Sequence, residues 1–305
     1  MDTLRSNPGT TFRASPGMLY FLQRMVIIHW MRAPIITILG FWIRLRNPSA
    51  AADRPDACES MQAFQPALNA LEQCGYSPLP PLLTEAQVDE MHAFLRDKRV
   101  VDRRDPARTH PTDTLPAGIR LADYTMTDIL ACPHVLRLAN DPRLLELATR
   151  YIGCKPTISA VLLRWSFPSD APGAGVQAFH RDSDDWRFLK VFFYLTDVDE
   201  GAGPHVYVRG SHRMNSTLRL HTFSDKTIEA TWGDAAIKVL GPRGFAFAAD
   251  TYGVHKGMVP TTRPRLLLQI QYSLLPVFAY EYRPETYHGN LALDPYVNRL
   301  MLRRG

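Results

Sequence analysis

The sequence predicts mixed α and β structure, with an antiparallel β-sandwich or barrel in its C-terminal half. Beyond residue 156 the chain breaks into short β-rich runs separated by Gly, Pro and Asp. No helix-length run separates these strands, which argues against a parallel doubly wound sheet. The part before them carries helical patterns instead. We therefore expect one domain at 61–305, with a helical buttress at 61–156, a β core at 157–276 and a C-terminal tail at 277–305.

The positive charge of the protein is concentrated at its N-terminus. The 305 residues include 35 Lys and Arg and 30 Asp and Glu, a net charge of +5. Residues 1–48 contain six arginines and one acid, Asp2, and so account for the whole excess. The basic isoelectric point therefore gives no reason to expect a nucleic-acid partner for the domain.

An apolar stretch at 18–46 lies within this basic segment. Arg24, Arg32 and Pro34 interrupt it, and the apolar piece at 33–43 is shorter than the roughly 20 residues of a membrane span. It also lacks the layout of a signal peptide. Three interpretations remain: a helix packed on the body or on a second subunit, a helix lying in a membrane interface, and an organelle-targeting peptide.

A Pro-, Ala- and Asp-rich linker is expected at 49–60, followed by two well-marked helices. One begins after Thr84, with Gln87 at the spacing of a capping box. The other begins after Asp141 and ends before Gly153. The four cysteines are widely spaced and form no zinc-ligand pattern. A reduced, cytoplasmic protein, with possible peripheral attachment to a membrane, is therefore expected.

The segment VQAFHRDSDDW, residues 176–186, directs two potential metal ligands to one side. Side chains alternate along a strand, so His180 and Asp182 share a face while Arg181 points away. His255 follows a distant strand and supplies a third ligand. Two histidines and one carboxylate form the facial triad typical of non-haem Fe(II), which leaves positions open for a co-substrate and O₂.

A 2-oxo acid bound to such a metal would need a positive partner for its second carboxylate. Arginine suits this role because its guanidinium stays charged and can bind a carboxylate bidentately. Arg265 lies ten residues after His255, at the start of an apolar strand. Arg263 is the alternative, but the intervening Pro264 makes its direction less predictable, and we prefer Arg265.

These features together resemble the phytanoyl-CoA dioxygenase-like branch of the Fe(II)/2-oxoglutarate oxygenases. The resemblance rests on the HxD motif, the distant histidine and arginine, and the segment FLKVFFYLTDVDEGAGPHVYVRGSHR, and it covers about residues 120–275. It implies a double-stranded β-helix, a jelly-roll of the cupin type, that uses iron, 2-oxoglutarate and O₂. It also implies that His180, Asp182 and His255 hold the iron and that Arg265 holds the distal carboxylate of 2-oxoglutarate.

Two positions depart from the family pattern. The family arginine more often lies eleven residues after the histidine, and Gly257 stands where members often have Ser or Thr. The groups that support the co-substrate beside Arg265 therefore stay open. Related halogenases replace the metal-binding carboxylate with a small residue, so the presence of Asp182 favours hydroxylation.

Four further residues are candidates for co-substrate or substrate contacts. Lys190 could reach 2-oxoglutarate or be a lysine at the rim, and Arg164, inside an apolar strand, needs an anionic partner. Trp186 could contact the substrate or cover the mouth of the barrel. Asp184 could contact the substrate or be a solvated acid in a loop. Rival metal ligands are His205 and His212.

The resemblance predicts an oxygenase that hydroxylates an unactivated C–H bond of a small-molecule or lipid-linked metabolite, with release of succinate and CO₂. The alternatives are a metal-binding barrel of another class, such as an isomerase or binding protein, and an inactive family member. Peripheral membrane contact through 18–46 is the one macromolecular contact expected. The sequence does not determine the oligomeric state.

Overall fold

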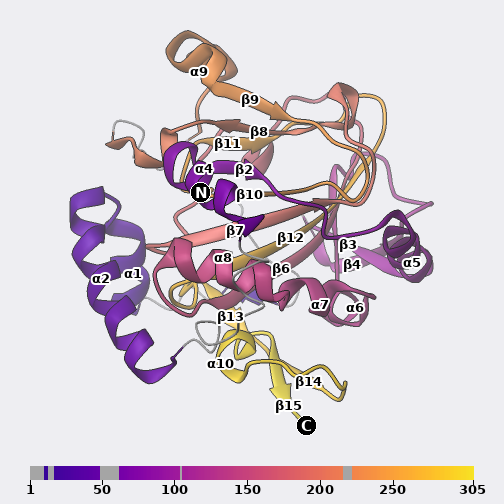
Figure 1. The fold of residues 1–305 in the computed structure, drawn as a ribbon. Helices are drawn as coiled ribbons and strands as arrows, with labels where there is room; N and C mark the ends of the chain where they lie inside the picture. The colour runs from indigo at the N-terminus through magenta and orange to yellow at the C-terminus, as the bar shows by residue number, and fades with distance from the viewer. Residues whose placement is uncertain (1–9, 13–16, 49–61, 104, 216–221) are drawn as a thin grey trace.

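The computed structural model describes residues 10–12, 17–48, 62–103, 105–215 and 222–305. Its centre is formed by two antiparallel sheets that face one another (Figure 1). The larger sheet has the strand order β2 (Tyr76–Pro78), β10 (Ala246–Ala249), β7 (Phe188–Tyr194), β12 (Arg265–Ser273), β6 (Thr157–Ser166), β5 (Leu121–Tyr124), β3 (Arg99–Asp102), β4 (Asp105–Pro111). The smaller sheet has the order β11 (His255–Gly257), β8 (His205–Val208), β9 (Ala236–Val239). The expected mixed α and β fold is confirmed.

Helices cover the outer face of the larger sheet (Figure 1). They are α4 (Gln65–Cys74), α5 (Glu85–Leu95), α6 (Met126–Ala131), α7 (Val135–Ala139), α8 (Pro142–Ile152) and α10 (Pro295–Asn298). The smaller sheet carries α9 (Asp225–Trp232). Two small additional sheets pair β1 (Thr10–Phe12) with β13 (Tyr280–Tyr282), and β14 (Glu285–Tyr287) with β15 (Leu302–Arg304).

The two predicted helices begin and end as their capping residues indicate. At the start of α5, Gln87 N donates to Thr84 Oγ1 at 3.3 Å and Thr84 N donates to Gln87 Oε1 at 3.0 Å. Asp141 caps α8 by accepting a bond from the Arg143 amide at 2.9 Å. Gly153 ends α8 with φ of 92°, a left-handed conformation that favours glycine.

The larger sheet separates two environments because successive side chains point to opposite faces. Val191 and Leu268 lie in the core beneath the helices, whereas Phe192 and Leu267 face the smaller sheet. The burial of both faces explains why these strands read as continuous apolar runs. The space between the sheets is where polar residues gather.

The region at 61–156, expected to be helical, also supplies β2, β3, β4 and β5 to the larger sheet. β4 has the sequence DPARTHP and lies at the edge of the sheet. Prolines and charges are typical of edge strands, and they do not produce the apolar alternation that marks a strand in a sequence. The predicted linker at 49–60 lies outside the described residues.

Two helices of the N-terminal segment, α1 (Met18–Met25) and α2 (His29–Arg46), lie along one side of the body, at the left in Figure 1. Gln23 and Arg32 are their most deeply buried side chains, at 3% and 6% exposed. One side of the two helices thus packs on the body, and the contact made by the other side stays a prediction. Among the described helices, none is both long and apolar enough to cross a bilayer.

Candidate metal centre

His180, Asp182 and His255 form a compact cluster between the two sheets. Asp182 Oδ1 lies 3.5 Å from His180 Nε2, and Asp182 Oδ2 lies 3.4 Å from His255 Nε2. All three side chains are buried, and one potential ligand atom from each lies within 4.8 Å of the others. The sequence predicted these three residues as one set of ligands, and the fold brings them together.

The local backbone explains the convergence. His180 and His255 exchange two backbone hydrogen bonds of 2.9 Å, and the Asp182 amide donates to Thr251 O, also at 2.9 Å. The chain at His180 is thus extended, so alternation places Asp182 on the same side. Arg181 points away, where its guanidinium donates to Ser211 O at 3.2 Å.

Both histidines are oriented by main-chain carbonyls. Nδ1 of His180 lies 2.8 Å from Ala178 O, and Nδ1 of His255 lies 2.9 Å from Gly253 O. A carbonyl only accepts hydrogen bonds, so each Nδ1 carries a proton and each Nε2 is directed at Asp182. Such support for the second ring nitrogen is typical of metal-binding histidines.

Lys190 of β7 holds the carboxylate of the cluster. Its ammonium lies 2.6 Å from Asp182 Oδ2 and 3.1 Å from Asp184 Oδ2, and the side chains of all three residues are less than 10% exposed. Lys190 also lines the cavity described below, whereas Asp184 does not. The solvated loop acid expected at Asp184 is wrong, because Lys190 neutralises it in the interior.

Asp185 and Trp186 are also buried, at 2% and 4% exposed, and not at a solvent-facing rim. Asp185 accepts hydrogen bonds from the amides of Trp186 and Leu275, both at 2.7 Å, and from Gln23 Nε2 at 2.9 Å. Burial raises the pKa of Asp185 to about 7, against the effect of these donors. Trp186 lies outside the set of described residues that line the cavity.

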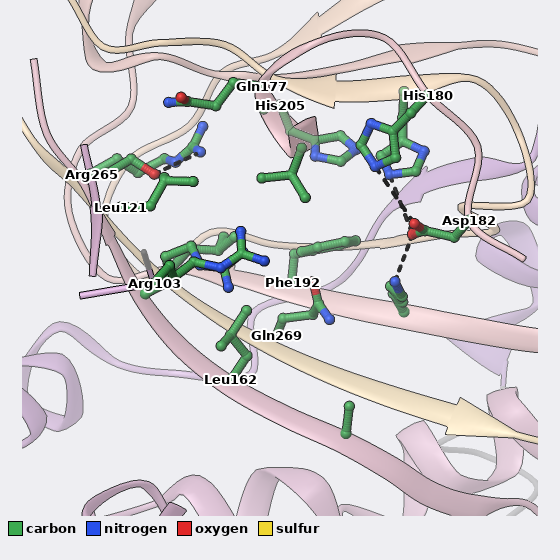
Figure 2. A pocket seen from close by; sticks show the side chains of 18 of the residues that line it. Arg103, Leu121, Leu162, Gln177, His180, Asp182, Phe192, His205, Arg265 and Gln269 are labelled. Carbon is green, nitrogen blue, oxygen red and sulfur yellow. Dashed lines mark hydrogen bonds and ion pairs between the residues drawn. The ribbon is translucent and has the colours of Figure 1, made fainter. Parts of the chain in front are cut away.

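A cavity of about 110 Å³ extends from the cluster between the sheets. Figure 2 shows His180 and Asp182 at one end and Arg265 with Gln177 at the other. Apolar groups such as Phe192 and Leu162 lie along the wall between them (Figure 2). A molecule bound here would meet a metal site and a cation at opposite ends.

Arg265 begins β12 and is 5% exposed. Its Nη2 donates a long hydrogen bond of 3.4 Å to Ser166 Oγ, while Nε and Nη1 have no partner among the described residues. Burial lowers the pKa of Arg265, but a guanidinium remains charged at neutral pH. Arg263 instead pairs with Asp199 in an exposed position. A buried cation without a protein anion is a site for an anionic ligand.

Arg164 already has a protein partner. Its guanidinium binds Asp123 bidentately, with distances of 2.5 and 2.7 Å, and Arg103 lies 3.7 Å from the same carboxylate. Asp123 lies in β5, Arg164 in β6 and Arg103 directly after β3, and both arginines line the cavity. The anion that the sequence required beside Arg164 is therefore Asp123, and a co-substrate role for Arg164 stays a prediction.

Gln177 and His205 both line the cavity; the sequence indicated His205 only as a rival metal ligand and did not indicate Gln177. Nε2 of each is buried without a hydrogen-bond partner among the described residues. The 3₁₀ turn at Gly175–Gln177 swings Gln177 into the cavity, and the glycines around it were the available signal. Burial and the nearby His255 lower the pKa of His205 well below its usual value, so the ring is neutral at pH 7.

The two histidines expected as rival ligands lie outside the cluster. The His205 ring stacks on His255 with centroids 5.4 Å apart, but it belongs to no group of potential ligands among the described residues. Nε2 of His212 lies 3.3 Å from Glu72 O. His205 therefore lines the cavity, and His212 lies outside the set of described residues that line it.

Gly257 lies so close to the guanidinium of Arg265 that a side chain at this position would contact it. A Cβ built on Gly257 would lie 3.0 Å from Arg265 Nη2. We expect Gly257→Val to displace the guanidinium and to raise the dissociation constant of 2-oxoglutarate about tenfold, equivalent to about 1.4 kcal/mol. Calorimetric titration measures this constant, and the metal content of the variant should match that of the wild type. An unchanged affinity would contradict the placement of the ligand beside Arg265.

A family model places the chain among known proteins. The model for phytanoyl-CoA dioxygenase matches residues 71–256, more than half of the chain, and includes His180, Asp182 and His255. The chain belongs to the phytanoyl-CoA dioxygenase family. Ectoine dioxygenases from Bordetella parapertussis and Bordetella bronchiseptica are 28% and 29% identical to it over 162 residues. The alignment covers 48% of this chain, and the chain spans about half the length (49%) of these curated relatives.

A solved structure of HygX from Streptomyces hygroscopicus with nickel and 2-oxoglutarate bound has the same fold. It aligns over 75% of this chain and 92% of HygX, with a TM-score of 0.52 and 18% identity. The HygX complex that also contains hygromycin B gives a TM-score of 0.51 and 19% identity over the same shares. The likeness confirms the double-stranded β-helix core expected for this phytanoyl-CoA dioxygenase family member.

Proposed function

We propose that this protein is an Fe(II)- and 2-oxoglutarate-dependent dioxygenase that hydroxylates an unactivated C–H bond. One observation carries the proposal: the cluster of potential metal ligands and the buried guanidinium of Arg265, which has no carboxylate partner among the described residues, lie at opposite ends of one cavity. In the reaction, the substrate C–H, 2-oxoglutarate and O₂ become the C–OH product, succinate and CO₂. The substrate class that we propose is a small molecule or a lipid-linked metabolite.

The residues of the site suit this ligand set. Two imidazole nitrogens and one carboxylate on one side would hold Fe(II), which would supply the open positions where 2-oxoglutarate and O₂ bind. Arg265 would bind the distal carboxylate of 2-oxoglutarate and so fix its orientation along the cavity. Lys190 keeps the Asp182 carboxylate in place through its contact of 2.6 Å. The apolar side chains of Phe192 and Leu267 exclude water from the space between.

Gln177 and His205 supply the polar contacts that remain. Each presents a buried Nε2 without a partner among the described residues. A neutral His205 can donate or accept one hydrogen bond there without adding charge. We assign both residues to ligand binding, and Asp182 favours hydroxylation because related halogenases have a small residue in place of this carboxylate.

The cellular setting that we propose is the cytoplasm. The three described cysteines are Cys74, Cys132 and Cys154, and all are free thiols. Burial raises the pKa of Cys132 to about 12 and that of Cys154 to about 11, so both stay protonated and unreactive. Such thiols suit a reducing compartment, which also keeps iron in the ferrous state.

Anaerobic addition of Fe(II) and 2-oxoglutarate should produce a visible charge-transfer absorption, because the 2-oxo acid chelates the metal. Admission of O₂ with ascorbate should then release succinate, and a metal chelator should abolish both signals. A metal-binding protein of another class would bind Fe(II) but show neither the 2-oxoglutarate-dependent absorption nor succinate. An inactive family member would show no succinate even with metal and 2-oxoglutarate bound, and either result would refute the proposal.

A further inference from the structure

The N-terminal hairpin, defined as α1 and α2 (residues 18–46), exposes large apolar side chains and buries the polar side chains of Gln23 and Arg32. Large exposed apolar side chains among the described residues all belong to this hairpin except Leu240 and Leu291. Met25 and Trp30 are 71% and 73% exposed. A surface of this kind on a folded protein marks a contact site for another apolar phase.

Polar contacts fix which side of the hairpin faces the body. Gln23 donates to Asp185 Oδ1 at 2.9 Å and to Pro276 O at 3.1 Å, and it accepts from the Phe278 amide at 3.0 Å. The guanidinium of Arg32 lies 3.6 Å above the ring of Tyr252. These contacts orient the hairpin, so its apolar side cannot turn inward without breaking them.

The exposed apolar residues of α2 form one continuous stripe. Trp30, Ile38, Phe41 and Leu45 are each more than half exposed and follow one another at three-, four- and eight-residue intervals. Residues at such spacing share a face of a helix. The stripe therefore runs along the length of α2, a dimension that suits a flat apolar phase more than a small pocket.

The charges of the hairpin select an anionic partner. Residues 18–46 contain no acid and four arginines, of which Arg32 packs against the body and Arg44 donates to Gly153 O. Arg46 is exposed and lies 5.6 Å from the ring of Trp42, and the guanidinium of Arg24 lies 5.2 Å from the ring of Tyr20. Arginine beside tryptophan and tyrosine at the border of an apolar face is the composition of a helix that lies in a lipid interface. A second copy of the hairpin would instead bring arginines together with no acid of its own to pair with them.

We propose that the N-terminal hairpin binds the surface of an anionic lipid bilayer, with the apolar face of α1 and α2 inserted at the boundary of headgroups and acyl chains. The arginines at the border then contact the anionic headgroups. The bilayer covers the apolar surface that the body leaves open. The contact is peripheral, because no described helix can cross the membrane.

The test is cosedimentation of the full chain with phospholipid vesicles. Wild-type protein should bind vesicles of phosphatidylcholine with phosphatidylglycerol more tightly than vesicles of phosphatidylcholine alone, and added salt should weaken the difference. The double variant Trp30→Ser, Phe41→Ser should lower the partition coefficient at least about tenfold. The matched control Leu240→Ser, Leu291→Ser removes two comparably exposed apolar side chains outside the hairpin and should leave binding unchanged.

Two outcomes would overturn the proposal. In one, the wild type fails to bind either kind of vesicle. In the other, light scattering shows that the wild type is a dimer and that the double variant is a monomer, and vesicles do not dissociate the wild-type dimer. Circular dichroism and Fe(II) binding verify that the double variant is folded. A second variant, Arg46→Glu, reverses an exposed charge whose printed contact is with Trp42 of the same helix, and it should weaken the preference for anionic vesicles.

Discussion

His255→Ala should give a folded protein that no longer retains Fe(II) and that forms succinate at least about a thousandfold more slowly. The substitution removes one of three ligands whose donor atoms lie within 4.8 Å of one another. A two-ligand site cannot fix the metal geometry on which the open coordination positions depend. In the wild type, metal at about a hundred times its dissociation constant should stabilise the fold by about 2.7 kcal/mol. Thermal unfolding with and without metal should show that this stabilisation is lost in the variant.

The informative control is His205→Gln. His205 is equally buried and stacks on His255, yet it lies outside the ligand cluster. We expect this variant to keep one metal per chain, measured by elemental analysis, whatever happens to its turnover. Retention of metal by His255→Ala together with its loss from His205→Gln would show that the cluster has been assigned wrongly.

Arg265→Met should weaken 2-oxoglutarate binding about a hundredfold or more and leave metal binding intact. The physical reason is that the guanidinium is the one cation at its end of the cavity without a protein carboxylate among the described residues. Removing the guanidinium also removes a buried charge that has no carboxylate partner among the described residues of the ligand-free protein. The free energy of unfolding without ligand should therefore be unchanged or raised by about 1–2 kcal/mol. Calorimetric titration and urea denaturation measure the two effects separately.

Arg164→Met provides a matched contrast within the same cavity. Arg164 binds Asp123 bidentately, so its loss leaves a buried carboxylate with only Arg103 nearby, at 3.7 Å. We expect a destabilisation of about 3 kcal/mol. A similar loss of stability in Arg265→Met, with 2-oxoglutarate affinity retained, would mean that Arg265 is structural.

Part of the site was predictable from rules that act over short distances in the chain, whereas His255 was identified by its spacing in the family pattern. Alternation along an extended segment predicted that His180 and Asp182 share a face, as they do in the cluster. The sequence also predicted that Arg265 begins an apolar strand, and it is the first residue of β12. Capping residues fixed the ends of α5 and α8 in the same way. In each case the decisive information lies within a few residues of the feature itself.

The surroundings of the site were not predictable, because they depend on contacts between distant parts of the chain. Asp184 could be a solvated loop acid by sequence, but the fold buries it beside Lys190, and it buries the neighbouring Asp185 beside Gln23. Arg164 looks like a ligand contact until folding brings Asp123 from β5 beside it. Edge strands such as β4 carry no apolar alternation, so pairing with β3 alone defines them.

The residues that bind Gln23 are synthesised long after the hairpin itself. Its partners Asp185, Pro276 and Phe278 follow it by 162 to 255 residues. At ribosomal rates of about 5–20 residues per second, the hairpin emerges about 10–50 seconds before the groups that receive it. During that interval it has no docking site, while its apolar residues are already available. The lipid contact proposed for the hairpin would therefore be able to form before the rest of the domain is complete.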